Sequence, residues 1–209
     1  MYALVESGTI TKYFNNPQGF TLGDNQYPAD IFTKWSVEEK EAIGIYEVVF
    51  DNSNKKDEQW YINTNQSFAF ADGIVTASYG TATAKSDVDI LFTQADSDNG
   101  DLPTGSSIGD LKTEGLKTSL VKSLKINVAN ELAKTDWYIT RNTEKSTAIP
   151  SNISTHRDAV RTKQAEMETA IINASDTPAL ETLHTYVNTG TEESPVMTRP
   201  LGELPKLEL

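Results

Sequence analysis

The chain has 209 residues, 37% of them hydrophobic, and a formal net charge of −12. This length suits one large or two small domains and is enough to bury a core. The longest apolar runs span a few residues, far short of the roughly 20 that cross a membrane. The first residues also lack the basic stretch and apolar core of a signal peptide. We therefore expect no membrane insertion, and a protein that stays on the cytosolic side unless it leaves as part of a larger particle.

The charge is unevenly distributed along the chain. Residues 1–110 carry 6 Lys, no Arg and 17 Asp or Glu, whereas residues 111–209 carry 12 Lys or Arg and 13 Asp or Glu. An acidic front half repels phosphate backbones, so we expect no nucleic-acid partner. The change near residue 110 indicates two modules. The absence of cysteine excludes disulfides and thiolate chemistry.

The front half has the pattern of a small β-rich domain with one short helix. Tyr2–Glu6 and Thr9–Phe14 predict a hairpin around a two-residue Ser-Gly turn. Ser36 with Glu39 three residues later predicts a capping box at the start of the helix, and Gly44 suits the position after its end. Further strands are predicted at residues 45–50, 60–63, 67–71 and 74–79, the last two joined by an Asp-Gly turn.

The back half changes to a helical period. Residues 94–110 are rich in Gly, Ser and Asp and predict an acidic linker or a long surface loop. From about Lys112 an apolar stripe with a spacing of four predicts a helix that runs to the Trp137–Tyr138 pair. The members of this stripe are Leu116, Leu120, Leu124, Val128 and Leu132.

A second long helix is expected after a polar connection over residues 139–150. Pro150 suits its first turn, and the helix over about 151–174 places Ile153, Val160, Met167 and Ile171 on one side. Asp176 predicts the cap of a short third helix, and the tail from Asn188 is expected to be extended and either docked or mobile. The expected fold class is α+β, with a β-rich docking domain (1–93), a linker (94–111), a helical hairpin module (112–187) and a Pro-containing tail (188–209).

Signatures of catalysis or metal binding are weak. In the acidic stretch 96–101, an EF-hand alignment places Ala95 at position 1 and Ser106 at position 12, so that pattern fails, although an irregular oxygen site stays open beside a solvated linker. His156 and His184 are the only imidazoles, no nucleophile elbow is present, and phosphate-binding loops are absent. We therefore expect no enzyme, no cofactor and no metal site.

Aromatic and basic residues are the better candidates for an interaction site. Exposed aromatic side chains can stack on sugars, but Trp35 and Trp60 are expected in the core and Trp137 as a lock between helices. Arg157 and Arg161 lie one turn apart in the predicted second helix, with Arg141 and Lys145 upstream. This basic patch is interpreted either as a contact for acidic residues or as a solvated helix face.

The same stretch resembles a helical module of tailed-bacteriophage tail-fibre assembly and tail-associated proteins. The family pattern is a helix ending in Leu-Ala-x-Thr-Asp-Trp, a short variable stretch with Ile-Pro, and a helix with x-Arg-x-x-Val/Leu-Arg. The start of the chain over residues 1–8 and the stretch from Trp35 to Tyr46 are also similar. The residues that carry the helical pattern are Leu132, Ala133, Thr135, Asp136, Trp137, Ile149, Pro150, Arg157, Val160 and Arg161.

This resemblance implies a non-enzymatic structural component of a phage tail or tail-fibre apparatus that attaches to other tail or fibre proteins in the virion. It also implies a location in the virion tail, passage through the host cytoplasm during assembly, and a homo-oligomer. The candidate interaction residues are Asp136, Trp137, Tyr138, Arg157 and Arg161. A soluble fibre-assembly chaperone absent from the mature particle and a receptor- or glycan-binding tip protein stay open as alternatives.

Overall fold

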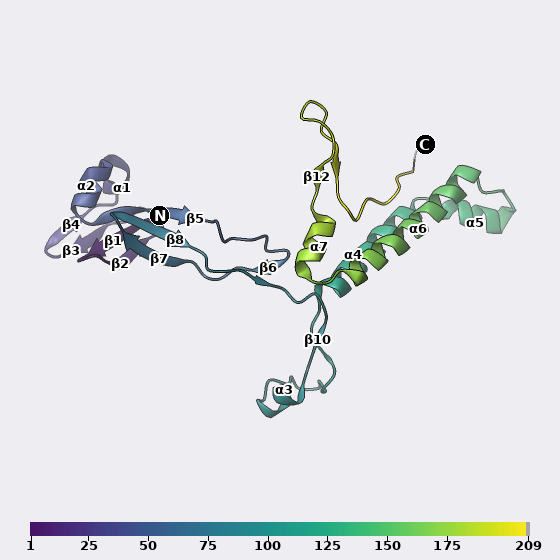
Figure 1. Cartoon of the computed structure of the whole chain (residues 1–209), viewed down its shortest axis with the longest axis horizontal. Coiled ribbons are helices and arrows are strands. Elements are labelled where there is room, and N and C mark those ends of the chain that lie inside the picture. Colours follow the sequence, from purple (N-terminus) through teal and green to yellow (C-terminus); the bar gives the residue numbers. More distant parts are fainter. Residues whose placement is uncertain (208–209) are drawn as a thin grey trace. The chain divides into compact units, whose positions relative to one another are not determined.

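The computed structural model describes residues 1–207 and divides the chain into two compact units, Met1–Thr83 and Ala84–Leu209 (Figure 1). Strands dominate the first unit and long helices the second, which confirms the predicted α+β class. The division falls at residue 83, whereas composition placed a linker at residues 94–111. These residues belong to the second unit.

The first unit is built on a five-stranded sheet with the order β2-β1-β5-β8-β7. Strands β5 and β8 pair in parallel and the other neighbours are antiparallel. Both predicted tight turns are confirmed, with positive φ at Ser7 and Gly8 (52° and 77°) and at Asp72 and Gly73 (51° and 78°), as a type I′ turn requires. The strands are β1 (Tyr2–Glu6), β2 (Thr9–Phe14), β5 (Ile45–Asp51), β7 (Ser67–Ala71) and β8 (Ile74–Ser78).

Each face of this sheet has its own core because alternate side chains of β1 point to opposite faces. Ala3 and Val5 pack with residues of β5 and β8, whereas Leu4 packs on the other face with aromatic residues that include Phe14 and Phe32. The second core is covered by α1 (Ile31–Lys34) and by the hairpin of β3 (Phe20–Leu22) and β4 (Asn25–Tyr27). Trp60 is 4% exposed and Trp35 packs partly buried against this second core, as expected.

Two short helices are present where the sequence predicts one. The predicted helix is α2 (Val37–Ala42), and its capping box between Ser36 and Glu39 is confirmed. Gly44 follows at φ +81°, and a Cβ there would lie 2.4 Å from the Val5 carbonyl oxygen, so only glycine fits. Helix α1 has four residues and no side-chain cap, so it leaves no signal that sequence reasoning could find. The small strands β6 (Tyr61–Ile62) and β9 (Thr83–Ala84) pair with each other.

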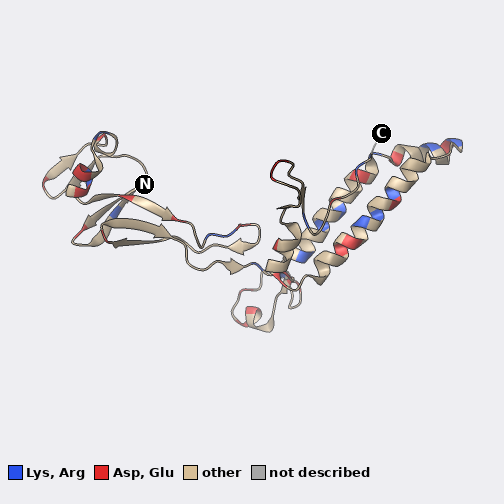
Figure 2. Cartoon of the chain, turned by 45° about the horizontal axis from the view of Figure 1, so that its top comes forward, with Lys and Arg blue, Asp and Glu red and all other residues tan. Residues whose placement is uncertain are grey.

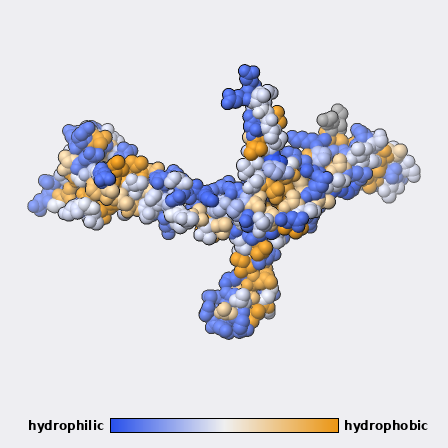
Figure 3. Space-filling model, in the orientation of Figure 1, coloured by the Kyte–Doolittle hydropathy of each residue, from blue (hydrophilic) through white to orange (hydrophobic). Residues whose placement is uncertain are grey.

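The predicted linker is instead a structured arm of the second unit. Strands β10 (Ile90–Leu91) and β11 (Leu111–Thr113) form an antiparallel pair, and α3 (Gln94–Asp98) lies between them in sequence with its own capping box from Thr93 and Asp96. Hydrophobic residues lie at the surface of this arm (Figure 3). The side chains of Ile90, Leu91 and Leu111 are between 43% and 48% exposed. The capping box of α3 was not predicted, because the Gly, Ser and Asp around it are also typical of a linker.

The helical module consists of α4 (Leu116–Ala133), α5 (Asp136–Lys145), α6 (Ser151–Asn173) and α7 (Thr177–His184). Helices α4 and α6 pack along each other, and the predicted apolar side of α6 is buried. The outer faces of these two helices carry Lys, Arg, Asp and Glu (Figure 2). Asp176 caps α7 by accepting a hydrogen bond from the Ala179 N–H, as predicted. None of the helices described within residues 1–207 is long and apolar enough to span a membrane.

Two expectations for this module are wrong. The first helix ends at Ala133, before the Trp-Tyr pair, and residues 139–145 of the expected polar connection belong to α5. The break falls at Thr135, whose hydroxyl donates to the Leu132 carbonyl oxygen at 2.9 Å and competes with the helical backbone hydrogen bonds. In the tail, β12 (Val187–Asn188) and β13 (Met197–Thr198) pair as a hairpin. Residues 201–207 then follow without helix or strand, and Leu201 is buried; we call this segment the strap.

Candidate functional site

Arg157 of α6 holds the corner between α4 and α5. Its Nη1 group donates to the Leu132 carbonyl oxygen at 2.8 Å, to the Thr135 hydroxyl at 2.7 Å and to Asp136 Oδ1 at 2.8 Å. The Thr135 side chain is fully buried and that of Arg157 is 10% exposed. One guanidinium group therefore joins the end of one helix, the break and the start of the next, so Arg157 and Asp136 are structural residues of this corner.

His156 and Glu131 lie next to this corner. His156 Nε2 is 3.3 Å from Glu131 Oε1, and both side chains are largely buried. Glu131 also pairs with Lys134, which directly follows the end of α4. The hydrogen bond from Lys134, more than the nearby imidazole, keeps the pKa of the Glu131 carboxyl below its usual range. These titratable groups are engaged in the contact between α4 and α6.

Trp137 is not a lock between helices, because its side chain faces outward and is 51% exposed. The centroids of the Trp137 and Tyr138 rings lie 3.7 Å apart. The guanidinium carbon of Arg141 lies 4.9 Å from the centroid of the Trp137 ring and 5.8 Å from that of the Tyr138 ring. We call these three residues of α5 the aromatic platform. An exposed Trp beside a half-buried Tyr and an Arg over both rings is the composition typical of energetic centres in protein interfaces.

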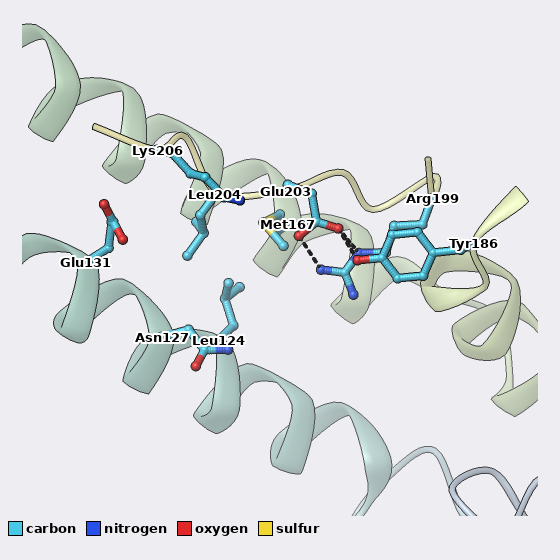
Figure 4. A pocket seen from close by; sticks show the side chains of 9 residues that line it. All are labelled: Leu124, Asn127, Glu131, Met167, Tyr186, Arg199, Glu203, Leu204 and Lys206. Atoms are coloured by element: carbon cyan, nitrogen blue, oxygen red, sulfur yellow. Dashed lines mark hydrogen bonds and ion pairs between the residues drawn. The ribbon is translucent and has the colours of Figure 1, made fainter. Parts of the chain in front are cut away.

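A groove runs from this platform along α4 and α6, partly covered by the strap. A cavity of about 600 Å³ lies beside the platform, lined by Glu131, Lys134, Trp137, Tyr138, Lys206 and Leu207. A second cavity of about 510 Å³ lies further along the groove, where Leu204 of the strap points toward Leu124 of α4 (Figure 4). Both cavities are open at the surface of the helical module.

An ionic cluster closes the far end of the groove. Arg199 Nε lies 2.8 Å from Glu203 Oε1, and Arg199 Nη2 donates to Glu203 Oε2 at 3.0 Å. Tyr186 donates a hydrogen bond to the same carboxylate (Figure 4), which raises the pKa of the tyrosine. Sequence reasoning missed this cluster, although Arg199 and Glu203 are four residues apart and Leu201, Leu204 and Leu207 recur every third residue.

The structure separates the two arginines that the sequence grouped as a basic patch. The side chain of Arg161 is 52% exposed and pairs with Asp158 at 3.2 Å, whereas Arg157 is buried. A common basic face is therefore wrong, because the two residues differ in burial although they lie one turn apart. Of the five candidate interaction residues, only Arg157 is buried. Trp137 and Tyr138 reach the surface of α5, and the side chains of Asp136 and Arg161 are 60% and 52% exposed.

The other chemical candidates also occupy structural positions. Asp96 completes the capping box of α3 by accepting a hydrogen bond from the Thr93 N–H, and it pairs with Lys112. Residues 1–207 contain no group of three or more His, Asp or Glu side chains placed to hold a metal ion. His184 is partly buried, as expected: its Nδ1 lies 2.8 Å from the Leu180 carbonyl oxygen, and burial lowers its pKa. Trp60 is too deeply buried to stack on a sugar. Comparison of the chain with protein-family models, curated proteins and solved structures finds no match.

Proposed function

We propose that this protein is a non-enzymatic structural component of a tailed-bacteriophage tail or tail-fibre apparatus that attaches to neighbouring proteins in the virion. The observation that carries the proposal is the aromatic platform, in which exposed Trp137 and half-buried Tyr138 lie on a short helix whose start is fixed by buried Arg157. A rigid aromatic surface loses little conformational entropy on binding. Attachment is thus the function that this chemistry serves best.

The residues behind the phage-tail resemblance support this proposal because four of them form a single structural element. Leu132, Thr135 and Asp136 provide the three acceptors of Arg157. Trp137 follows directly and is presented outward. The resemblance therefore corresponds to a folding module that displays an aromatic side chain, and not to a set of catalytic groups.

Mass spectrometry of purified particles tests the retained role. We expect the chain in washed virions at a stoichiometry set by the tail symmetry. If the chain is instead found with immature fibres and is absent from mature particles, the role is that of an assembly chaperone. Its binding to host glycans in a Trp137-dependent manner would favour a tip protein.

A pair of substitutions tests the platform itself. Trp137→Ala removes an exposed ring, so the free energy of unfolding should change by less than about 1 kcal/mol, while loss of an interface anchor should weaken attachment by about 2 kcal/mol, roughly 30-fold. The matched control is Ile126→Ala on α4, where the side chain is 61% exposed but lies outside the platform. Incorporation into particles is measured by quantitative mass spectrometry. Equal incorporation of the two variants would contradict the assignment of the platform as the attachment surface.

A further inference from the structure

The arm exposes apolar side chains on both of its strands and in its loop. Leu91 of β10 and Leu111 of β11 lie directly opposite each other, so they share one face of the two-stranded ribbon. They are 47% and 48% exposed, and Val88, Ile90 and Ile108 are between 43% and 55% exposed. A lone two-stranded hairpin is at best marginally stable in water and gains stability when its apolar face packs on another surface. The arm therefore presents a surface suited to a partner.

The arm is also strongly acidic. Residues 86–114 contain six Asp, one Glu and a single Lys. Three of these carboxylates pair with lysines of the same module. Asp98, Asp101 and Asp110 form no ion pair within residues 1–207. A surface that complements the arm has to combine apolar area with positive charge.

The aromatic platform has this complementary composition. Trp137 is 51% exposed beside the cavity of about 600 Å³, which Lys206 also lines. Arg141 and Lys145 lie four residues apart on α5, on one face of the helix. Among the described residues, none of these three cations forms an ion pair, and Glu144 is the one carboxylate of α5 that also lacks one. The platform thus carries an excess of positive charge on a chain whose net charge is −12.

The other basic surface of the helical module fits the arm less well because its charges are neutralised. Lys117, Lys122 and Lys125 line a cavity of about 350 Å³ on α4. Each of these lysines pairs with a carboxylate of the same module. The platform is therefore the better match, since it offers both apolar area and unpaired positive charge.

The strands of the arm cannot reach the platform of their own chain. The base of the arm is fixed to the start of α4, where the Leu116 N–H donates to the Ser86 carbonyl oxygen at 3.0 Å and Lys117 pairs with Asp87 at 2.9 Å. Leu91 lies four residues beyond Asp87, so it reaches at most about 14 Å from this base. The platform follows the opposite end of α4 (Figure 1), whose 18 residues span about 27 Å. Contact between the two surfaces therefore requires a second copy.

We propose that the arm of one copy docks on the aromatic platform of a second copy. In this contact, Leu91 and Leu111 cover the ring of Trp137. The arm carboxylates face Arg141 and Lys145. The inference rests on the proposed function in taking the platform as an attachment surface, and it names the occupant. Because the arm of the second copy stays free, such head-to-tail contacts continue from copy to copy and end in a ring when the rotation closes.

A mixing experiment tests this arrangement on the isolated full chain. The double variant Leu91→Ser and Leu111→Ser keeps its platform, and Trp137→Ala keeps its arm. In a dilution series up to about 100 μM, above the Kd of a micromolar interface, light scattering should show species larger than a dimer for the unsubstituted protein. Loss of an interface anchor should weaken association of either variant alone about 30-fold. An equimolar mixture should then form a dimer of about twice the 23.0 kDa mass of one chain, because one intact arm meets one intact platform.

The β12–β13 hairpin provides the matched control for the arm. The double variant Val187→Ser and Met197→Ser removes apolar side chains that are 50% and 55% exposed on a second two-stranded ribbon. It should assemble like the unsubstituted protein. The proposal is overturned if the unsubstituted protein stays monomeric, if the mixture stays monomeric, or if the hairpin control loses assembly as the arm variant does.

A charge substitution supplies a second test that leaves the apolar ribbon intact. Asp101→Lys on the arm should weaken association several-fold, because the new charge opposes the cations of the platform. Glu192→Lys, in the loop between β12 and β13, changes the net charge by the same amount and should leave association unchanged. Equal effects of the two substitutions, or stronger association with Asp101→Lys, would refute the arm as the occupant.

Failure of this inference and failure of the proposed function give different results. If the mixed variants do not associate but Trp137→Ala is still lost from particles, the platform binds another tail protein and the arm contact is refuted. If the mixed variants associate but Trp137→Ala enters particles as well as Ile126→Ala does, the arm contact stands and the attachment role in the virion is refuted.

Discussion

The two units of the molecule bury their apolar residues in different ways. In Met1–Thr83 the sheet has a separate core on each face, one made with the parallel pair β5–β8 and the other with α1 and the β3–β4 hairpin. In the helical module, α4 and α6 share one seam, and an extended strap with cavities beside it covers part of the groove. The sheet of the first unit therefore has an enclosed core on each face, whereas the helical module has an open groove beside the exposed Trp137 ring.

The largest expected effect tests whether the first unit is enclosed as described. Phe14 is fully buried and contacts the rings of Phe20 and Phe32 at centroid distances of 4.9 Å and 5.2 Å. Phe14→Ala removes these contacts and leaves a cavity, so we expect a loss of about 3–5 kcal/mol in the free energy of unfolding. Hydrogen exchange with mass spectrometry should show lost protection across the sheet and unchanged protection in α4 and α6.

Phe50→Ala is the matched control for this substitution. The Phe50 side chain is 48% exposed on β5, so its truncation should cost less than about 1 kcal/mol. Equal losses for the two variants would show that the core around Phe14 is not the main source of stability in this unit. Loss of protection in α6 would show that the two units unfold together.

An intermediate effect tests the corner of the helical module. Arg157→Ala leaves the buried Thr135 hydroxyl without its donor and removes one of the donors to the Leu132 carbonyl oxygen, and we expect a loss of about 1–3 kcal/mol. Arg161→Ala, one turn away, removes an exposed pair with Asp158 and should change stability by less than about 1 kcal/mol. Thermal unfolding followed at 222 nm measures both. A larger loss for Arg161→Ala would contradict the structural assignment of Arg157.

The elements that were predictable are those whose determinants lie close together in sequence. The Ser-Gly and Asp-Gly turns, the Ser36–Glu39 capping box and the Asp176 cap each depend on two to four neighbouring residues, and all are confirmed. The spacing of apolar residues likewise located α4 and α6. These signals sufficed for the α+β class because each depends on local sequence and not on long-range contacts.

The candidate site was less predictable because it depends on contacts across the module. The outward-facing Trp137 follows a corner that Arg157, 20 positions later, holds by its hydrogen bonds to Leu132 and Asp136. Arg157 and Arg161 have the same chemistry and a spacing of one turn, so no local pattern distinguishes the buried residue from the exposed one. The break at Thr135 was hidden for the same reason, since Thr is tolerated inside helices and only its hydroxyl contacts show that α4 ends there.

The smallest expected effect concerns the arm, which is held by local polar contacts instead of a core. The Lys112 hydrogen bond, with the Thr93 backbone and hydroxyl, lowers the pKa of Asp96 from 3.8 to about 2. Because the folded-state pKa lies below the unfolded value, the Asp96 contribution to stability is present above pH ~4 and is lost as the pH falls toward 2.

Nuclear magnetic resonance titration of the Asp96 carboxyl should show this low pKa, and Lys112→Gln should raise it toward 3.8. Lys145→Gln on α5 should leave it unchanged. An ordinary Asp96 pKa in the unsubstituted protein would mean that the capped arm is not formed in solution, whereas frayed α3 signals at low pH beside an intact sheet would confirm that the two units are stabilised by different physical means.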